Sequence, residues 1–347
     1  MPSISFNKER TQIIKGITLI MMIIHHSSTP IYWAEEESSL FQLLEHLVLS
    51  TKMCVYIFAF LVGYGFYCSK NKTIQYSCKR IFLVLIPFWT MLACMFIPAA
   101  YFSNNLDTAL KYNENDWVIE LIYNMFGLSE SLNWYSWFVG FYCISILMMP
   151  FLYKSMEKYK YAWIIIILGY YIAAAGIHTI PEWNKIPFTN ILFTTCRLIP
   201  LIIVGYMCGV WNRKGIIPQW FEGKNKLLLS LIAIIIIMLI NAFRYPVAGF
   251  CIQAFYTPIL IFAIIGIFNS YEVKWLNKVL IKVGNLSMYM WFFHAIFFTE
   301  TVNLYTKHLV FEPINNYFYT LIMTLLLTYV GSYIIQKIIS PITKLIK

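Results

Sequence analysis

Long apolar runs recur along the whole chain and are separated by short polar or basic stretches. Each run approaches the roughly 20 residues that an α-helix needs to cross about 30 Å of hydrocarbon. A shorter apolar stretch, 117–127, is flanked by acidic residues and is expected to lie at the membrane surface. The pattern predicts an all-α, polytopic membrane protein of about ten transmembrane helices, near 12–33, 44–68, 81–102, 134–153, 161–178, 191–211, 226–243, 246–268, 284–301 and 317–341.

The charged residues between these runs predict an orientation. Most of the 26 Lys and Arg residues fall in every second connecting segment, together with the two ends of the chain. Acidic residues such as Glu35, Asp116 and Glu130 fall in the alternate segments. Because cytoplasmic segments of membrane proteins are rich in Lys and Arg, both termini are expected to be cytoplasmic. The apolar opening segment has no small-residue cleavage pattern and is expected to remain as a helix.

Composition supports a membrane protein and argues against the other classes. Hydrophobic residues make up 60% of the 347-residue chain and charged residues only 12%, which is not typical of a soluble domain. The net charge of +10 could suggest a nucleic-acid partner. The basic residues are scattered in short clusters between apolar runs and do not gather on one solvated face, so no nucleic acid is expected. The eight cysteines include no CxxC pair, and neither a disulfide framework nor a metal site is expected.

The first apolar run contains the clearest candidate for chemistry. His25 and His26 are followed directly by three hydroxyl residues, deep inside a segment that is otherwise lipid-like. Ionisable groups at this depth are costly, and they usually face a cavity with a function. Lys15 and His26 are eleven residues apart, which places them on one helix face about 16 Å apart. His26 could act as a base, or it could simply be hydrogen-bonded between helices.

Other polar and aromatic residues at membrane depth are candidates for binding. Lys79 and Arg80 would suit a phosphorylated ligand, although such clusters also serve topology and lipid headgroups. Glu45 could orient a histidine, or it could pair with Lys52, which is an equally plausible partner for this carboxylate. Five residues are predicted to contact substrate: His25, Glu45, Trp137, Tyr289 and His294. The chain has no GxSxG, P-loop, GxGxxG or HExxH motif, so no permanently bound cofactor is expected.

Taken in order, these features resemble the membrane-bound acyltransferase-3 family. The resemblance covers most of the chain and begins with the Lys15-x10-His26 spacing in the first helix. Its other elements are the second-helix ending Val62-Gly63-Tyr64, the basic entry Lys79-Arg80 followed by Pro87, and the later landmarks Trp137-Phe138 with Pro150, Gly205-Tyr206, Ser287-Met288-Tyr289 and His294. The chain departs from the family at Lys15, where arginine is commoner, and at Val62, where serine is usual.

The resemblance implies an activity. Such proteins move an acyl group, most often acetyl from acetyl-CoA, to a carbohydrate hydroxyl at or beyond the outer face of the membrane. His26 would be the essential histidine, either as a base or as an acylated intermediate, and Lys15, Lys79 and Arg80 would meet the CoA phosphates. The predicted partners are therefore acyl-CoA as co-substrate, a cell-surface or lipid-linked glycan, and the bilayer of the plasma or inner membrane. A transporter or exporter of polysaccharide or lipid-linked sugar is the alternative.

Overall fold

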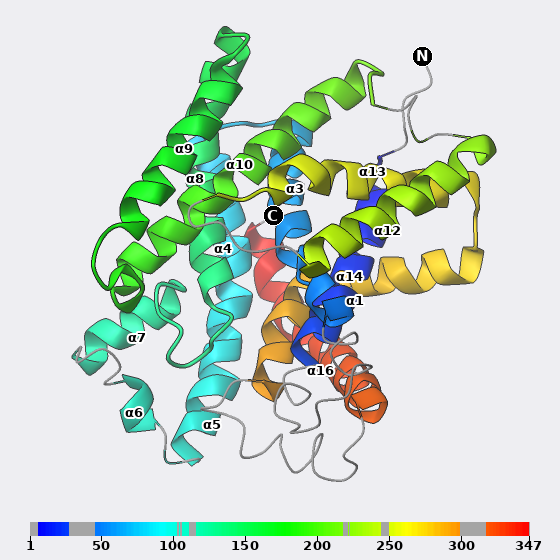
Figure 1. The fold of residues 1–347 in the computed structure, drawn as a ribbon. Coiled ribbons are helices and arrows are strands. Elements are labelled where there is room, and N and C mark those ends of the chain that lie inside the picture. The colour runs from blue at the N-terminus through cyan, green and yellow to red at the C-terminus, as the bar shows by residue number, and fades with distance from the viewer. Residues whose placement is uncertain are drawn as a thin grey trace. The chain divides into compact units, whose positions relative to one another are not determined.

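The computed structural model describes residues 6–27, 46–102, 104, 106–110, 116–217, 221, 223–243, 250–298 and 317–346. Within these ranges every regular element is a helix, and no strand occurs (Figure 1). This confirms the all-α prediction.

Eight helical segments are long and apolar enough to cross a membrane: His46–Cys68, Ile74–Phe102, Trp137–Lys158, Pro187–Arg213, Lys224–Phe243, Gln253–Ser270, Lys274–Phe297 and Tyr319–Leu345. The apolar helix α9 (Ala162–His178) is shorter, at 17 residues. Helix α1 (Lys8–Ser27) is not among the eight and carries several charged residues along its 20-residue length. The protein is therefore a polytopic membrane protein. The count of ten spans and the cytoplasmic termini stay predictions.

Two helices begin earlier than the apolar pattern predicts. Helix α4 (Ile74–Met91) starts where the Thr73 side chain accepts a hydrogen bond from the Tyr76 amide, at 3.2 Å. This cap satisfies a backbone donor at the helix terminus, so the helix includes a polar first turn. Helix α14 (Lys274–His294) likewise begins ahead of its apolar part. Its three lysines, Lys274, Lys278 and Lys282, are spaced four residues apart on one exposed face.

The chain forms two compact units, and each is described by itself. Unit 1 comprises residues up to Lys70 and Leu198–Ser287. It contains α1, α3 (Met53–Cys68), the second part of α10 (Pro187–Arg213), α12 (Leu227–Phe243), α13 (Gln253–Ser270) and the first part of α14. Helix α12 packs against α13, and α1 against α3 and α13 (Figure 1).

Close backbone contacts hold unit 1 together. A Cβ on Gly16 of α1 would lie 2.3 Å from the Leu280 carbonyl oxygen of α14. A Cβ on Gly284 of α14 would lie 2.0 Å from the carbonyl oxygen of Gln12 on α1. Only glycine allows the two backbones to approach this closely, as is common between membrane helices. The pair therefore fixes the place where α1 and α14 cross. A hydrogen bond of 2.8 Å from Arg10 Nε to Asn269 Oδ1 also ties α1 to α13.

Unit 2 comprises Asn71–Arg197 and Met288–Lys347. Its helices are α4, the π-helical turn η2 (Leu92–Phe96), α5 (Ile97–Phe102), α6 (Leu106–Leu110), α7 (Trp117–Met125), α8 (Trp137–Lys158), α9, the first part of α10, the end of α14 and α16 (Tyr317–Ile346). Helix α4 packs against α8, where the Ser77 hydroxyl donates to the Ile146 carbonyl at 2.6 Å, and also against α16. The nine-residue α7 is too short to span a bilayer, so it fits the expected surface helix.

Candidate functional site

Helix α1 carries the two residues on which the sequence prediction depends most. It runs without a break from Lys8 to Ser27, so helical geometry places Lys15 and His26 on one face, about 16 Å apart. Ile13, Leu19 and other apolar side chains of α1 are fully buried. Lys15 and His26 are only half-buried and keep part of their surface accessible. The buried side chains therefore anchor the helix, while this pair remains partly accessible.

The two adjacent histidines have different surroundings. Their ring centroids lie 5.2 Å apart, with the ring planes tilted by 48°. His25 hydrogen-bonds with the backbone of Val48 and lies close enough to Lys52 for an electrostatic interaction. Residues near Val48 therefore contact His25 directly. Glu45, which the sequence analysis considered as a partner for a histidine, lies outside the described residues.

The predicted phosphate-binding cations belong to different units. Lys79 and Arg80 lie within α4 of unit 2, nearly two turns after its cap, and both are exposed. Arg80 also forms a side-chain hydrogen bond with Tyr142 of α8, which directs its guanidinium toward that helix. Lys15 belongs to unit 1. A joint role for the three cations in binding CoA phosphates stays a prediction.

Aromatic rings at the start of α8 and the end of α14, including the predicted substrate contact Trp137, pack against one another in unit 2. The Phe138 and Trp291 ring centroids are 4.5 Å apart, and Trp137 lies 5.7 Å from Phe138. The start of α8 is thus brought together with the end of α14. Trp137 is half-buried, so part of its surface is accessible, whereas Trp291 is buried.

His294 and Tyr289 occupy separate positions at the end of α14. His294 has no exposed surface, its Nδ1 is hydrogen-bonded to the Trp291 carbonyl, and the Tyr135 ring lies 5.1 Å away. Direct substrate contact by His294 would require its neighbours to move. Tyr289 is buried as well and hydrogen-bonds with Thr343 of α16. Their assignment as substrate-binding residues stays a prediction.

A buried carboxylate was missed by the sequence analysis. Glu120 of α7 has no exposed surface, and its Oε1 accepts hydrogen bonds from the hydroxyls of Ser129 and Ser131, the latter at 2.9 Å. The Asn124 amide donates to the same oxygen at 3.3 Å, and its Oδ1 accepts from the Leu132 amide at 3.0 Å. We call Glu120, Asn124, Ser129 and Ser131 the Glu120 network. The signal that could have revealed it is the spacing of Glu120 and Asn124, four residues apart in an otherwise apolar stretch, which places both on one helix face.

The Glu120 network holds the loop that leads into α8. Ser136, the residue before α8, donates its hydroxyl to the Ser129 carbonyl at 2.6 Å. Gly127 begins the loop with a positive φ of 67°, and a Cβ there would lie 2.4 Å from the Ser136 carbonyl oxygen. Within the same loop, burial raises the pKa of Glu130 to about 7. The loop thus holds Ser136, the residue between Tyr135 and Trp137, through side-chain and backbone contacts.

The geometry described so far defines a multi-pass membrane protein with half-buried Lys and His side chains on one helix face. In the described part of the chain, no group of three or more His, Cys, Asp or Glu residues is arranged to hold a metal ion. The chain belongs to the acyltransferase-3 family, since the family model described as an acyltransferase domain matches residues 11–337. No curated protein and no solved structure matches it. The protein is therefore a membrane acyltransferase whose family match includes most of both units.

Proposed function

We propose that this acyltransferase moves an acyl group, most simply acetyl, from cytosolic acyl-CoA to a hydroxyl of a cell-surface or lipid-linked carbohydrate. The plasma or inner membrane is the proposed location, because there a cytosolic donor and an external acceptor meet across one bilayer. His26 is the proposed catalytic residue. Lys15, Lys79 and Arg80 are the proposed contacts for the phosphates of the donor.

The observation that carries this proposal is the unbroken helix α1 with Lys15 and His26 on one face. A CoA thioester carries its phosphates at one end and its reactive carbonyl far from them. A cation separated from an imidazole by about three helical turns matches such an extended, anionic donor. Both side chains are half-buried, so each has surface with which a ligand can make contact.

The reaction requires a proton to be moved from the acceptor to the leaving group. The neutral His26 imidazole accepts the proton of the acceptor hydroxyl as its oxygen attacks the thioester carbonyl. The carbon–sulfur bond then breaks, and the imidazolium returns the proton to the CoA sulfur. The products are an O-acyl ester and free CoA. A second route, in which the imidazole itself carries the acyl group between two transfers, uses the same residue and the same proton balance.

The remaining predicted contacts are proposed for two tasks: holding the His26 ring in place and binding the acceptor. His25 lies beside His26 and is held by the Val48 backbone, so it could keep the neighbouring ring in place. Trp137 has accessible surface at the start of α8 and could stack on a sugar ring. Glu45 and Tyr289 complete the set proposed for the acceptor, whereas the fully buried His294 would reach it only if its neighbours moved.

The test uses purified membranes and acetyl-CoA labelled in the acetyl group. Wild-type protein should transfer label to glycan, and His26→Ala should abolish the transfer while the protein still inserts into the membrane. His178→Ala is the matched control, because His178 is an exposed histidine at the end of α9 and should leave transfer unchanged. Normal labelling by the His26→Ala variant would contradict the assignment. Sugar flux across the membrane that needs no acyl donor would instead support the transporter alternative.

A further inference from the structure

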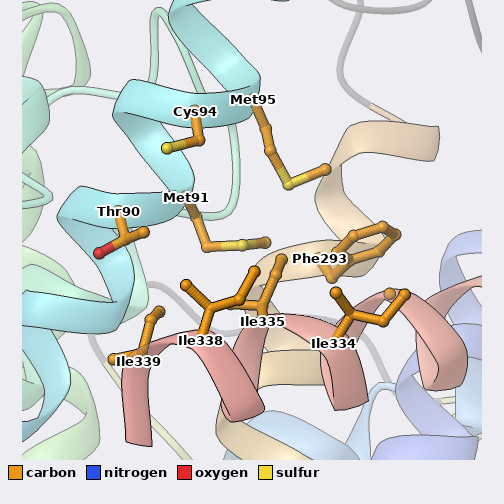
Figure 2. Close-up of a pocket in the computed structure, with 10 residues that line it drawn as sticks. Thr90, Met91, Cys94, Met95, Phe293, Ile334, Ile335, Ile338 and Ile339 are labelled. Atoms are coloured by element: carbon orange, nitrogen blue, oxygen red, sulfur yellow. The ribbon is translucent and has the colours of Figure 1, made fainter. Parts of the chain in front are cut away.

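An apolar groove of about 370 Å³ lies within unit 2, and none of its lining residues is among those proposed for catalysis or substrate binding. Helix α4 and the π-helical turn η2 form one wall, α16 forms the opposite wall, and Phe293 at the end of α14 closes one side. In Figure 2, Ile335, Ile338 and Ile339 of α16 point toward Met91 of α4. The complete lining is Thr90, Met91, Cys94, Met95, Phe293, Gly331, Ile334, Ile335, Ile338 and Ile339.

The lining offers no polar group to a ligand. Thr90 is the one hydroxyl residue among these ten, and its Oγ1 donates to the Ile86 carbonyl of its own helix at 2.9 Å. The hydroxyl is thus engaged by the backbone, and the groove presents an essentially apolar surface to a ligand. No charged side chain lines it. A phosphate, a sugar or a CoA nucleotide would lose its hydration here without gaining a hydrogen bond.

Two local features shape the groove. Cys94 and Met95 lie in η2, where a π-helical turn interrupts the regular helix, and such turns are rare and frequent at functional sites. On the opposite wall, a Cβ on Gly331 would lie 2.2 Å from the Phe293 ring. Glycine at this position lets the ring lie directly against the α16 backbone. The methionines in the lining are flexible and polarisable, so the wall can adapt to an irregular apolar ligand.

The position of the groove in the membrane indicates its occupant. Both walls belong to helices that are long and apolar enough to span a bilayer, and the lining residues lie away from the ends of these helices. Cys94, Ile334 and Ile338 are exposed, with Ile338 at 64%, so the groove is open to the surroundings. At this depth the surroundings are hydrocarbon, because headgroups and water lie nearer the ends of the helices.

We propose that this groove binds one hydrocarbon chain of a membrane phospholipid near the middle of the bilayer. The size of the groove falls within the range of ligand pockets in proteins. An acyl chain gains dispersion contacts with the branched isoleucines and with the methionines, and it needs no polar partner. This site does not depend on the acyltransferase chemistry, and it gives unit 2 a bound lipid at the contact between α4 and α16.

The test is photo-crosslinking of the full chain in vesicles that contain a phosphatidylcholine with a diazirine near the end of one acyl chain. Peptide mapping should find adducts on Met91–Met95 and Gly331–Ile339 at least about fivefold more often than on α9. Helix α9 is the matched control, since its Ile165 and Ile172 are 70% and 74% exposed but do not line the groove. Equal labelling of both surfaces would overturn the proposal, since it would indicate ordinary contact with bulk lipid.

Two variants from opposite walls make the test specific. Ile338→Trp and Cys94→Trp each add an indole at an exposed lining position, and each should reduce groove adducts to the level of α9 without changing the labelling of α9 itself. If one variant fails to insert, the other still decides the outcome. Unchanged groove labelling in an inserted variant would overturn the proposal. So would groove labelling by a diazirine-bearing polyisoprenoid alone, with none by the phospholipid.

Discussion

Two histidines, His26 in unit 1 and His294 in unit 2, have the same side chain in opposite surroundings. His26 is half-buried on α1 and keeps accessible surface. His294 has none, and the Trp291 carbonyl and the Tyr135 ring contact it directly. A group that exchanges a proton with a substrate needs contact with that substrate. Burial therefore separates a histidine suited to catalysis from one suited to packing, a distinction that the sequence alone does not make.

Polar groups elsewhere in the two units extend this contrast. In unit 2, the Glu120 carboxylate receives its hydrogen bonds from Asn124, Ser129 and Ser131, all within one short stretch of chain. Such a network stabilises the loop before α8 and needs no ligand. The His25–His26 pair lies in a helix whose Lys15 and His26 both keep accessible surface. Substitutions on α1 should therefore lower activity, whereas substitutions in the Glu120 network should lower stability.

The largest effect is expected from replacing the two histidines separately. His26→Ala should lower the rate of transfer about 10²–10⁴-fold, the usual contribution of a general base, and leave the melting temperature unchanged. His294→Ala should instead lower the free energy of unfolding by about 2–4 kcal/mol, because it leaves a cavity and removes the hydrogen bond between the imidazole and the Trp291 carbonyl. Transfer rates per folded molecule and thermal melting in detergent would check both. A stable His294→Ala protein without activity would contradict the packing role.

The next effect concerns the Glu120 network. Glu120→Ala should destabilise unit 2 by about 2–4 kcal/mol, because it leaves the hydroxyls of Ser129 and Ser131 without their buried acceptor. Glu157→Ala, an exposed glutamate on α8, is the control and should change the melting temperature little. Equal melting temperatures for the two variants would show that the network does not stabilise the loop.

A smaller effect is expected at Lys15. Lys15→Ala should raise the KM for acyl-CoA about tenfold with little change in kcat, because a charge-assisted contact to the donor is lost. Lys15→Arg keeps the charge and should restore most of the affinity. Steady-state kinetics at varied donor concentration would measure this. A fall in kcat with unchanged KM would instead place Lys15 close to the reacting groups.

The smallest effect is a pH dependence of stability at Glu130. Burial raises the pKa of this carboxyl from 4.5 to about 7, so the folded protein holds its proton more tightly than the unfolded chain does. Stability should therefore fall as pH rises from 4.5 to about 7 and change no further above that range. Glu130→Gln should remove this decline and raise the melting temperature at pH 8 more than at pH 4.5. Identical pH profiles for the wild type and the variant would contradict the prediction.

The sequence predicted the helices well because membrane spans depend on one dominant property, a long apolar run. Every predicted span overlaps a helix, and errors occurred at the ends, as at Thr73, where a side-chain cap extends α4 into a polar turn. The capping hydrogen bond depends on local geometry, and hydropathy reveals little of it. The surface helix at 117–127 was predicted from its length and its acidic flanks, and α7 has those features.

The candidate site was harder to predict because its contacts join residues far apart in the chain. The aromatic residues near Trp137 and Tyr289 were recognised as candidates for binding. The contact between the Phe138 and Trp291 rings was not predicted. Glu120 was considered only as part of an acidic flank, because its pairing with Ser129 and Ser131 requires the intervening loop to fold back. The Lys15–His26 relation was predictable because it depends on helix geometry alone.

The glycine crossing of α1 and α14 limits how the enzyme can move during turnover. Gly16 adjoins Lys15, and rotation of α1 about its axis would drive bulkier side chains into the backbone at Leu280. Sliding is opposed in the same way at Gly284 and Gln12. At this crossing α1 and the first part of α14 must therefore travel as one rigid body. Reorganisation between donor arrival and product departure has to come from side chains or from other parts of the chain.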